Sequence, residues 1–222
     1  MAELLLHQEI VLLSLDDSRG SFQGSYYTYA VAGAMVSELL LQNRIQTAAD
    51  KKKTVSVVSQ EPTGDAILDE VLQQIVDSNK ARALQTWVSR VSGIKHSVNR
   101  IAEQLVRLGV LKHDEKKILW LFNKQIYPEL DGTLEDHVRR RMANVMFDAK
   151  AVLDERTTVL VALASHSQLL KANFEPVELK QHRKRIKKIA AGELLASNAT
   201  LQAITAVQAA VMVACIMPAV VN

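Results

Sequence analysis

The sequence predicts a mainly α-helical protein, and three observations support this prediction. Glycine and proline, which interrupt helices, are scarce, with 8 and 4 copies in 222 residues. Leucine, alanine, valine, lysine and glutamate are abundant, whereas aromatic residues make up only 5% of the chain. Apolar residues also recur at helical spacing over long segments. Because no repeat, linker or shift of composition divides the chain, we expect residues 1–222 to form a single helical domain with one or two short β-hairpins.

The N-terminal segments combine apolar helical patterns with one hairpin. Residues 3–15 are apolar and form either a helix or a buried strand, and residues 16–20 end this segment as a turn. The spacing of apolar residues predicts a helix over 26–41. Residues 54–59 are rich in β-branched side chains and indicate a strand, while Lys51–Lys53 before them indicate an exposed hairpin tip.

Residues 61–72 predict a turn followed by an amphipathic helix. Pro62 and Gly64 favour the turn, because proline fixes φ and glycine tolerates a positive φ. Either Thr63 or Asp65 then caps the helix. Its apolar stripe consists of Ile67, Leu68, Val71, Leu72, Ile75 and Val76.

The C-terminal half predicts one further strand and several helices. Residues 98–108 form a second amphipathic helix, which Gly109 ends. A charged turn at 113–117 precedes an apolar strand at 118–122, and Tyr127-Pro128 begins the next turn. The remaining helices are expected at 134–150, 157–170, 177–190 and from 197 to the C-terminus. The last of these has no charged side chain after Glu193, but its alanine content and polar residues favour a buried helix over a membrane span.

The sequence shows none of the common catalytic or metal-binding motifs. A single cysteine, Cys215, excludes an internal disulfide and a cysteine-based metal cluster, and the six histidines lack zinc-binding spacing. Asp65, Asp69 and Glu70 are close together, but at a helix start carboxylates ordinarily complement the helix dipole. The start at Met1 shows no secretory signal pattern. We therefore expect no enzymatic activity, no cofactor, no metal and a reducing compartment.

Positive charge is concentrated in two places, although the net charge is only +3. Residues 180–188 hold six cations in nine positions, and Arg139–Arg141 are consecutive. Such clusters suit an anionic partner, either a membrane surface or a nucleic acid. The alternative is that they form solvated helix faces without a partner.

An ordered set of segments resembles the Golgi phosphoprotein 3 family of phosphoinositide-binding peripheral membrane proteins. The resemblance covers roughly residues 4–222. The matching segments are 35–39, 43–45, 61–72, 105–111, 118–122, 127–128 and 134–145. The resemblance implies a single, mainly helical domain that binds phosphatidylinositol 4-phosphate on the cytosolic face of Golgi membranes and helps to retain membrane-protein clients there.

The resemblance also implies a headgroup site, which this chain matches only in part. The family's pocket tryptophan falls at Gln23 and its first-helix arginine at Ala32, whereas two later basic positions fall at His137 and Arg140. Arginine forks bind phosphate oxygens bidentately, so Arg140 is the first candidate, followed by its neighbours in Arg139–Arg141. His137 contributes charge only when it is protonated. These departures imply weakened headgroup selectivity and suit a divergent, bacterial relative.

The sequence therefore predicts a non-enzymatic protein that binds phosphatidylinositol 4-phosphate-like or other anionic lipid headgroups at the cytosolic face of a membrane. It would serve as an adaptor for sorting membrane-protein clients. Two alternatives stay open. Residues 98–122 resemble the end of a winged helix that binds nucleic acid, with Arg100 and Arg107 on its helix. The chain could also be a protein-interaction scaffold that has lost the lipid site.

Overall fold

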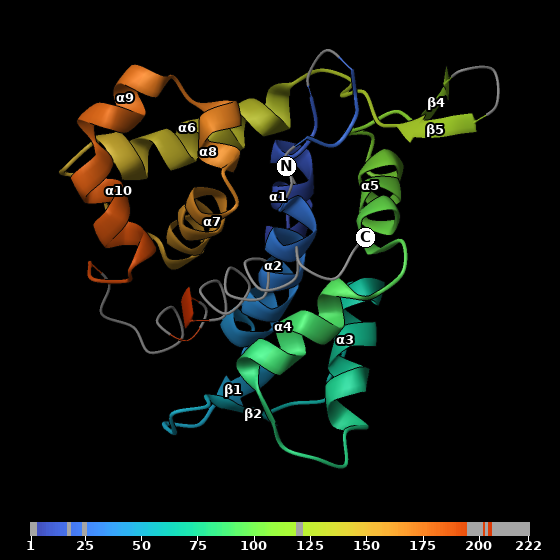
Figure 1. Ribbon diagram of the computed structural model, residues 1–222, viewed down its shortest axis with the longest axis vertical. Coiled ribbons are helices and arrows are strands. Elements are labelled where there is room, and N and C mark those ends of the chain that lie inside the picture. The colour runs from blue at the N-terminus through green and yellow to red at the C-terminus, as the bar shows by residue number, and fades with distance from the viewer. Residues whose placement is uncertain are drawn as a thin grey trace, which may run out of the picture.

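The computed structural model describes residues 4–16, 19–23, 26–118, 122–194, 202 and 204–205, and Figure 1 shows that helices dominate this part of the chain. The helices are α1 (Leu6–Leu13), α2 (Tyr27–Leu41), α3 (Ala66–Val76), α4 (Leu84–Ser92), α5 (Ser97–Arg107), α6 (Thr133–Phe147), α7 (Glu155–His166), α8 (Leu169–Asn173), α9 (Pro176–Gln181) and α10 (Arg183–Ala190). The strands are β1 (Ile45–Thr47), β2 (Thr54–Val57), β3 (Arg82–Ala83), β4 (Asp114–Ile118) and β5 (Phe122–Ile126). The mainly α fold class is confirmed.

Helix α1 lies at the centre of the fold, and every one of its residues is buried. It packs against α2, α5, α6 and α7, so that α3 to α5 lie on one side of it and α6 to α10 on the other (Figure 1). The segment that the sequence left open between helix and strand is therefore a helix. Because α1 is enclosed on all faces, its sequence shows no polar face by which a helical period could be recognised.

The helix predicted over 26–41 is confirmed as α2, and the strand predicted at 54–59 is confirmed in its first part as β2. Strand β2 lies between β1 and β3 and pairs antiparallel with both, with Ile45 opposite Val57. Lys51–Lys53 are exposed in the β1–β2 connection, as expected of a hairpin tip. The sequence analysis gave no bounds for β1, the first strand of that hairpin, and did not predict β3; the two strands have only three and two residues.

Asp65 is the residue that caps α3. Its Oδ1 accepts hydrogen bonds from the backbone N–H groups of Ile67 and Leu68, at 3.0 and 2.9 Å. The Thr63 hydroxyl instead donates to the Asp69 carboxylate at 2.7 Å, which holds the turn before the helix. The turn and the amphipathic helix are both confirmed.

The strand predicted at 118–122 is wrong, and so is the charged turn before it. Residues 114–118 form β4, and β5 begins at Phe122, which pairs with Ile118. Residues 119–121 lie outside the described residues. The apolar run therefore begins in one strand and ends in the next, and the charged residues 114–117 before it belong to β4, where Asp114 and Glu115 are exposed.

Three helix boundaries also differ from the prediction. The helix expected at 157–170 is divided into α7 and α8 at Gln168, whose φ is +67°. The helix expected at 177–190 is divided at His182 into α9 and α10, and α6 ends at Phe147 rather than at residue 150. The predicted final helix lies almost entirely outside the described residues. Among the helices that are described, none has the length and hydropathy needed to span a membrane.

Candidate anion-binding surface

Helix α6 presents a narrow solvent-facing stripe opposite its buried face. The helix starts after Gly132, whose φ of +68° glycine adopts without strain, and the acidic residues of its first turn complement the helix dipole. The buried face packs on α1, α7 and α10 through Val138, Met142, Val145 and Met146. The exposed stripe is formed by Thr133, Asp136, His137, Arg140 and Asn144.

The three consecutive arginines of α6 point in different directions, since successive residues of a helix are rotated by about 100°. Arg139 is directed toward α8 and interacts inside the protein. One of its terminal nitrogens lies 2.7 Å from the buried Glu135 carboxylate, and its Nε donates to Asn173 Oδ1 at 3.2 Å. Its main contacts in the structure therefore tie α6 to α8.

Arg141 is directed toward α1 and forms an ion pair and hydrogen bond with Glu9, whose side chain is only 2% exposed. Burial raises the pKa of the Glu9 carboxyl to about 7, although Arg141 and Arg156 act to lower it. Beside this pair, Arg156 donates from both terminal nitrogens to the Glu38 carboxylate of α2, at 3.1 and 2.7 Å. These charges connect α1, α2, α6 and α7 across the core.

Arg140 is the member of the triplet that faces solvent. Its Nε donates to the Asp136 carbonyl oxygen at 3.2 Å, and in the part of the chain that the structure describes no carboxylate forms an ion pair with it. His137 is exposed three residues earlier on the same stripe, so the two side chains are neighbours on the helix surface. The structure thus brings together the two positions that the resemblance assigned to this helix, and directs Arg139 and Arg141 elsewhere.

Gln23 lies in the loop between α1 and α2, where it binds the backbone of its own loop. Its Nε2 donates to the Leu15 carbonyl oxygen at 2.9 Å, and its side chain is half-buried. This loop contacts the segment that leads into α6, because the Tyr127 N–H donates to the Gly20 carbonyl oxygen at 2.6 Å. Ala32, in contrast, is fully buried in α2.

The basic run at 180–188 lies on α9 and α10, with most of its cations in solvent. Ile186 and Ile189 bury the opposite face of α10, and Arg185 donates from Nε to the Val145 carbonyl oxygen of α6 at 3.0 Å. Arg185 therefore joins two helices, which the sequence run did not reveal. The exposed cations are Lys180, Arg183, Lys184, Lys187 and Lys188.

Val177 adds an apolar side chain to this basic surface, and the sequence analysis missed it. It is 66% exposed on α9, a short helix of which no residue is buried. The signal available in the sequence was its position directly after Pro176, in the first turn of a helix flanked by charged residues. An exposed aliphatic residue beside several cations suits contact with an anionic membrane interface.

The two arginines considered for nucleic-acid binding, Arg100 and Arg107, lie in different surroundings. Arg100 of α5 forms an ion pair with Glu70 of α3 at 2.6 Å, which leaves Arg107 as the exposed arginine of that helix. A single exposed arginine offers little positive surface for a phosphate backbone.

The chain is thus a mainly helical protein with ion pairs inside the fold and, apart from them, a set of solvent-facing cations on α6, α9 and α10. The chain belongs to the Golgi phosphoprotein 3 family, because the family model described as "Golgi phosphoprotein 3 (GPP34)" matches residues 6–209. The resemblance found in the sequence is thereby confirmed over nearly the whole chain.

Two curated relatives carry the name vacuolar protein sorting-associated protein 74. The protein from Eremothecium gossypii is 29% identical over 164 residues, which cover 64% of this chain and 49% of the relative. The protein from Schizosaccharomyces pombe is 26% identical over 164 residues, which cover 64% of this chain and 48% of the relative. This chain therefore matches about half the length of these curated relatives.

Proposed function

We propose that this chain is a non-enzymatic peripheral membrane protein that binds phosphorylated or other anionic lipid headgroups through the exposed stripe of α6. The observation that carries the proposal is the position of Arg140, which faces solvent beside His137 while its two neighbours bind partners inside the fold. A guanidinium group with no competing carboxylate is available to form paired hydrogen bonds with phosphate oxygens. Headgroups similar to phosphatidylinositol 4-phosphate carry such oxygens.

The cations of α9 and α10 have a different role in this proposal. They add attraction to any anionic leaflet, worth about 1 kcal/mol for each lysine or arginine near the surface. Val177 would enter the interface beside them. Gln23 is the weakest proposed headgroup contact, since its amide nitrogen already donates to Leu15. Arg139 and Arg141 would act indirectly, by holding α6 in place.

The names of the relatives support a sorting role. Both are called vacuolar protein sorting-associated proteins, and the family is described as Golgi phosphoprotein 3. We therefore propose that the chain acts at the cytosolic face of a membrane as an adaptor for membrane-protein clients, at the Golgi in a eukaryotic cell or at the inner membrane in a bacterial one.

Co-sedimentation with vesicles tests the headgroup site. Vesicles would contain neutral lipid alone, a generic anionic lipid, or phosphatidylinositol 4-phosphate at matched total charge. The double variant Arg140→Gln/His137→Gln should lose the preference for the phosphoinositide, by about 1.5–3 kcal/mol if one charged hydrogen-bonding pair is lost. Arg107→Gln is the matched control, because it removes one exposed arginine from a different helix.

A second variant separates headgroup recognition from diffuse attraction. Lys184→Gln/Lys187→Gln should weaken binding to both kinds of charged vesicle equally, because both lysines are exposed on α10 and neither belongs to the α6 stripe. If the wild-type chain ignores all charged vesicles at low salt, the proposal is wrong. If it binds both kinds equally and the α6 variant changes nothing, the α6 site is wrong and only a general basic surface is left.

A further inference from the structure

A polar pocket lies far from the α6 stripe, at the C-terminal end of α3. It is bounded by the end of α3, the connection to β3, and α4, and it has a volume of about 470 Å³. Figure 1 shows that this region and α6 lie at opposite ends of the molecule. The volume falls within the range of pockets that hold small molecules. The proposed lipid-binding function makes no use of this pocket.

One side of the pocket is strongly basic. Lys80, Arg82 and Arg90 all line it, and none of them forms an ion pair with a carboxylate among the described residues. Arg82 is held by a hydrogen bond from its Nε to Ser78 Oγ at 3.3 Å, and Arg90 lies over the Trp87 ring at 5.5 Å from its centroid. These contacts orient two guanidinium groups while leaving most of their N–H donors open to a ligand.

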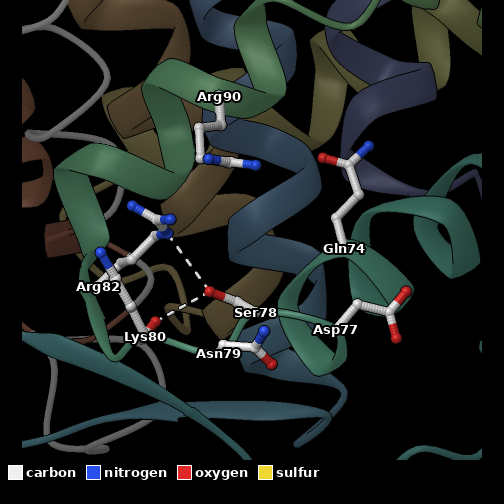
Figure 2. Close-up of a pocket in the computed structure, with 7 residues that line it drawn as sticks. All are labelled: Gln74, Asp77, Ser78, Asn79, Lys80, Arg82 and Arg90. Carbon is white, nitrogen blue, oxygen red and sulfur yellow. Dashed lines mark hydrogen bonds between the residues drawn. The ribbon is translucent and has the colours of Figure 1, made fainter.

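The other side of the pocket has a different chemistry. Figure 2 shows the Gln74 side chain of the α3 end turned toward Arg90, whereas the Asp77 carboxylate is turned away from the basic side chains; Asn79 also lines the pocket. The Asp77 carboxylate already accepts a hydrogen bond from Gln73 at 2.7 Å, which holds it in place. The side-chain amides of Gln74 and Asn79 both donate and accept hydrogen bonds, so they suit hydroxyl groups.

We propose that this pocket binds a phosphorylated polyol, such as a sugar phosphate. The phosphate would face Arg82, Arg90 and Lys80, since paired guanidinium donors match phosphate oxygens. The hydroxyl groups would face the side-chain amides of Gln74 and Asn79. A simple anion would use only the first set of groups, whereas a neutral polyol would use only the second. The two sides of the pocket together therefore favour a ligand that carries both a phosphate group and hydroxyl groups.

Isothermal titration calorimetry on the full chain tests the proposal with three probes: glucose 6-phosphate, glucose and inorganic phosphate. Glucose 6-phosphate should bind saturably and more tightly than either of the other two. Arg82→Gln/Arg90→Gln should weaken it about tenfold to a hundredfold. Arg107→Gln, which removes an exposed arginine outside the pocket, should leave it unchanged.

A variant of the opposite side tests the polyol part separately. Gln74→Ala should lower the affinity for glucose 6-phosphate relative to inorganic phosphate by about tenfold, because it removes an amide that donates to and accepts from ligand hydroxyl groups. If glucose 6-phosphate does not bind saturably, the proposal is overturned, and the cations only complement the C-terminal dipole of α3. Equal affinities of the wild-type chain for glucose 6-phosphate and phosphate would also overturn it.

The ligand could be a soluble sugar phosphate or the headgroup of a lipid, and the same variants separate these sources. In co-sedimentation, vesicles containing phosphatidylinositol would be compared with vesicles of phosphatidylglycerol at matched charge. If the chain prefers phosphatidylinositol and Arg82→Gln/Arg90→Gln removes this preference, the ligand is a lipid headgroup. If the chain shows no such preference but binds glucose 6-phosphate saturably, the ligand is a soluble sugar phosphate. The Arg140→Gln/His137→Gln variant should still bind glucose 6-phosphate, so a failure of the α6 site would not affect this result.

Discussion

Replacing Arg141 with methionine should destabilise the fold, whereas the same change at the adjacent Arg140 should not. Arg141 pairs with a Glu9 side chain that is 2% exposed, while Arg140 is exposed to solvent. Removing one partner of a buried pair leaves an uncompensated charge and typically costs about 3–5 kcal/mol. Because Arg156 also acts on Glu9, we expect a loss near the lower end, about 3 kcal/mol. Arg140→Met should change the free energy of unfolding by less than about 0.5 kcal/mol.

The effect of Arg141→Met should depend on pH in a defined direction. Burial raises the pKa of Glu9 from 4.5 to about 7 in the folded state, so its proton binds more tightly there than in the unfolded chain. The wild-type chain therefore loses stability as pH rises from 4.5 toward 7. Near pH 5 Glu9 is largely neutral with or without Arg141, and the penalty of the variant should fall to about 1–2 kcal/mol.

Urea unfolding followed by far-ultraviolet circular dichroism measures these differences directly, at about pH 5 and about pH 8. A double variant Arg141→Met/Glu9→Gln should recover part of the stability at the higher pH, because the uncompensated carboxylate is gone. Equal stabilities of Arg140→Met and Arg141→Met at about pH 8 would refute the reasoning. A penalty that grows on acidification would show that Glu9 is not the titrating partner.

Two further substitutions test the turns that position the helices. Asp65→Ala should cost about 1–2 kcal/mol, because it removes the α3 cap and the acceptor of the Gln104 amide, and urea unfolding against Thr63→Ala would measure it. Burial opposes ionisation of Asp65, but the His7 imidazole 3.6 Å away and hydrogen bonds from the α3 backbone lower its pKa to about 2, so its contribution should disappear as pH falls from 3.8 toward 2. Gly20→Ala should lower the melting temperature, since φ is +59° and the added Cβ would lie 2.5 Å from the Pro128 nitrogen. An unchanged melting temperature in that variant would show that the α1–α2 loop does not depend on this close approach.

Local patterns predicted those parts of the fold that local forces determine. The turn at Pro62 and Gly64, the cap at Asp65 and the apolar stripe of α3 all lie within one short segment of the chain. Neighbouring residues were therefore sufficient to predict their structure. The β4–β5 hairpin failed because its apolar run continues through the place where one strand ends at Ile118 and the next begins at Phe122. The pairing partner, which the run itself does not specify, decided the structure.

The candidate site was predictable in its sequence position but not in its geometry. Consecutive arginines indicated a basic helix, yet only the contacts of each arginine in the folded protein show which one faces solvent and can bind a ligand. The partner of Arg141 is Glu9, 132 residues earlier, and Arg139 binds Asn173, 34 residues later. No spacing rule connects residues so far apart. The α3–α4 pocket was missed for a different reason, since Lys80, Arg82 and Arg90 are near one another in the sequence but do not form a charge run.

The three consecutive arginines of α6 are subject to two kinds of evolutionary constraint, because two of them point into the fold and one points into solvent. Changes at Arg139 or Arg141 disturb helix packing and are removed by selection for folding, whatever the protein binds. Changes at Arg140 leave packing intact, so under the proposed function they are subject only to selection on the ligand. A lineage is therefore free to alter its binding specificity at this position while its scaffold stays the same. Basic residues at position 140 should consequently vary with habitat and membrane composition, whereas those at 139 and 141 should follow their internal partners.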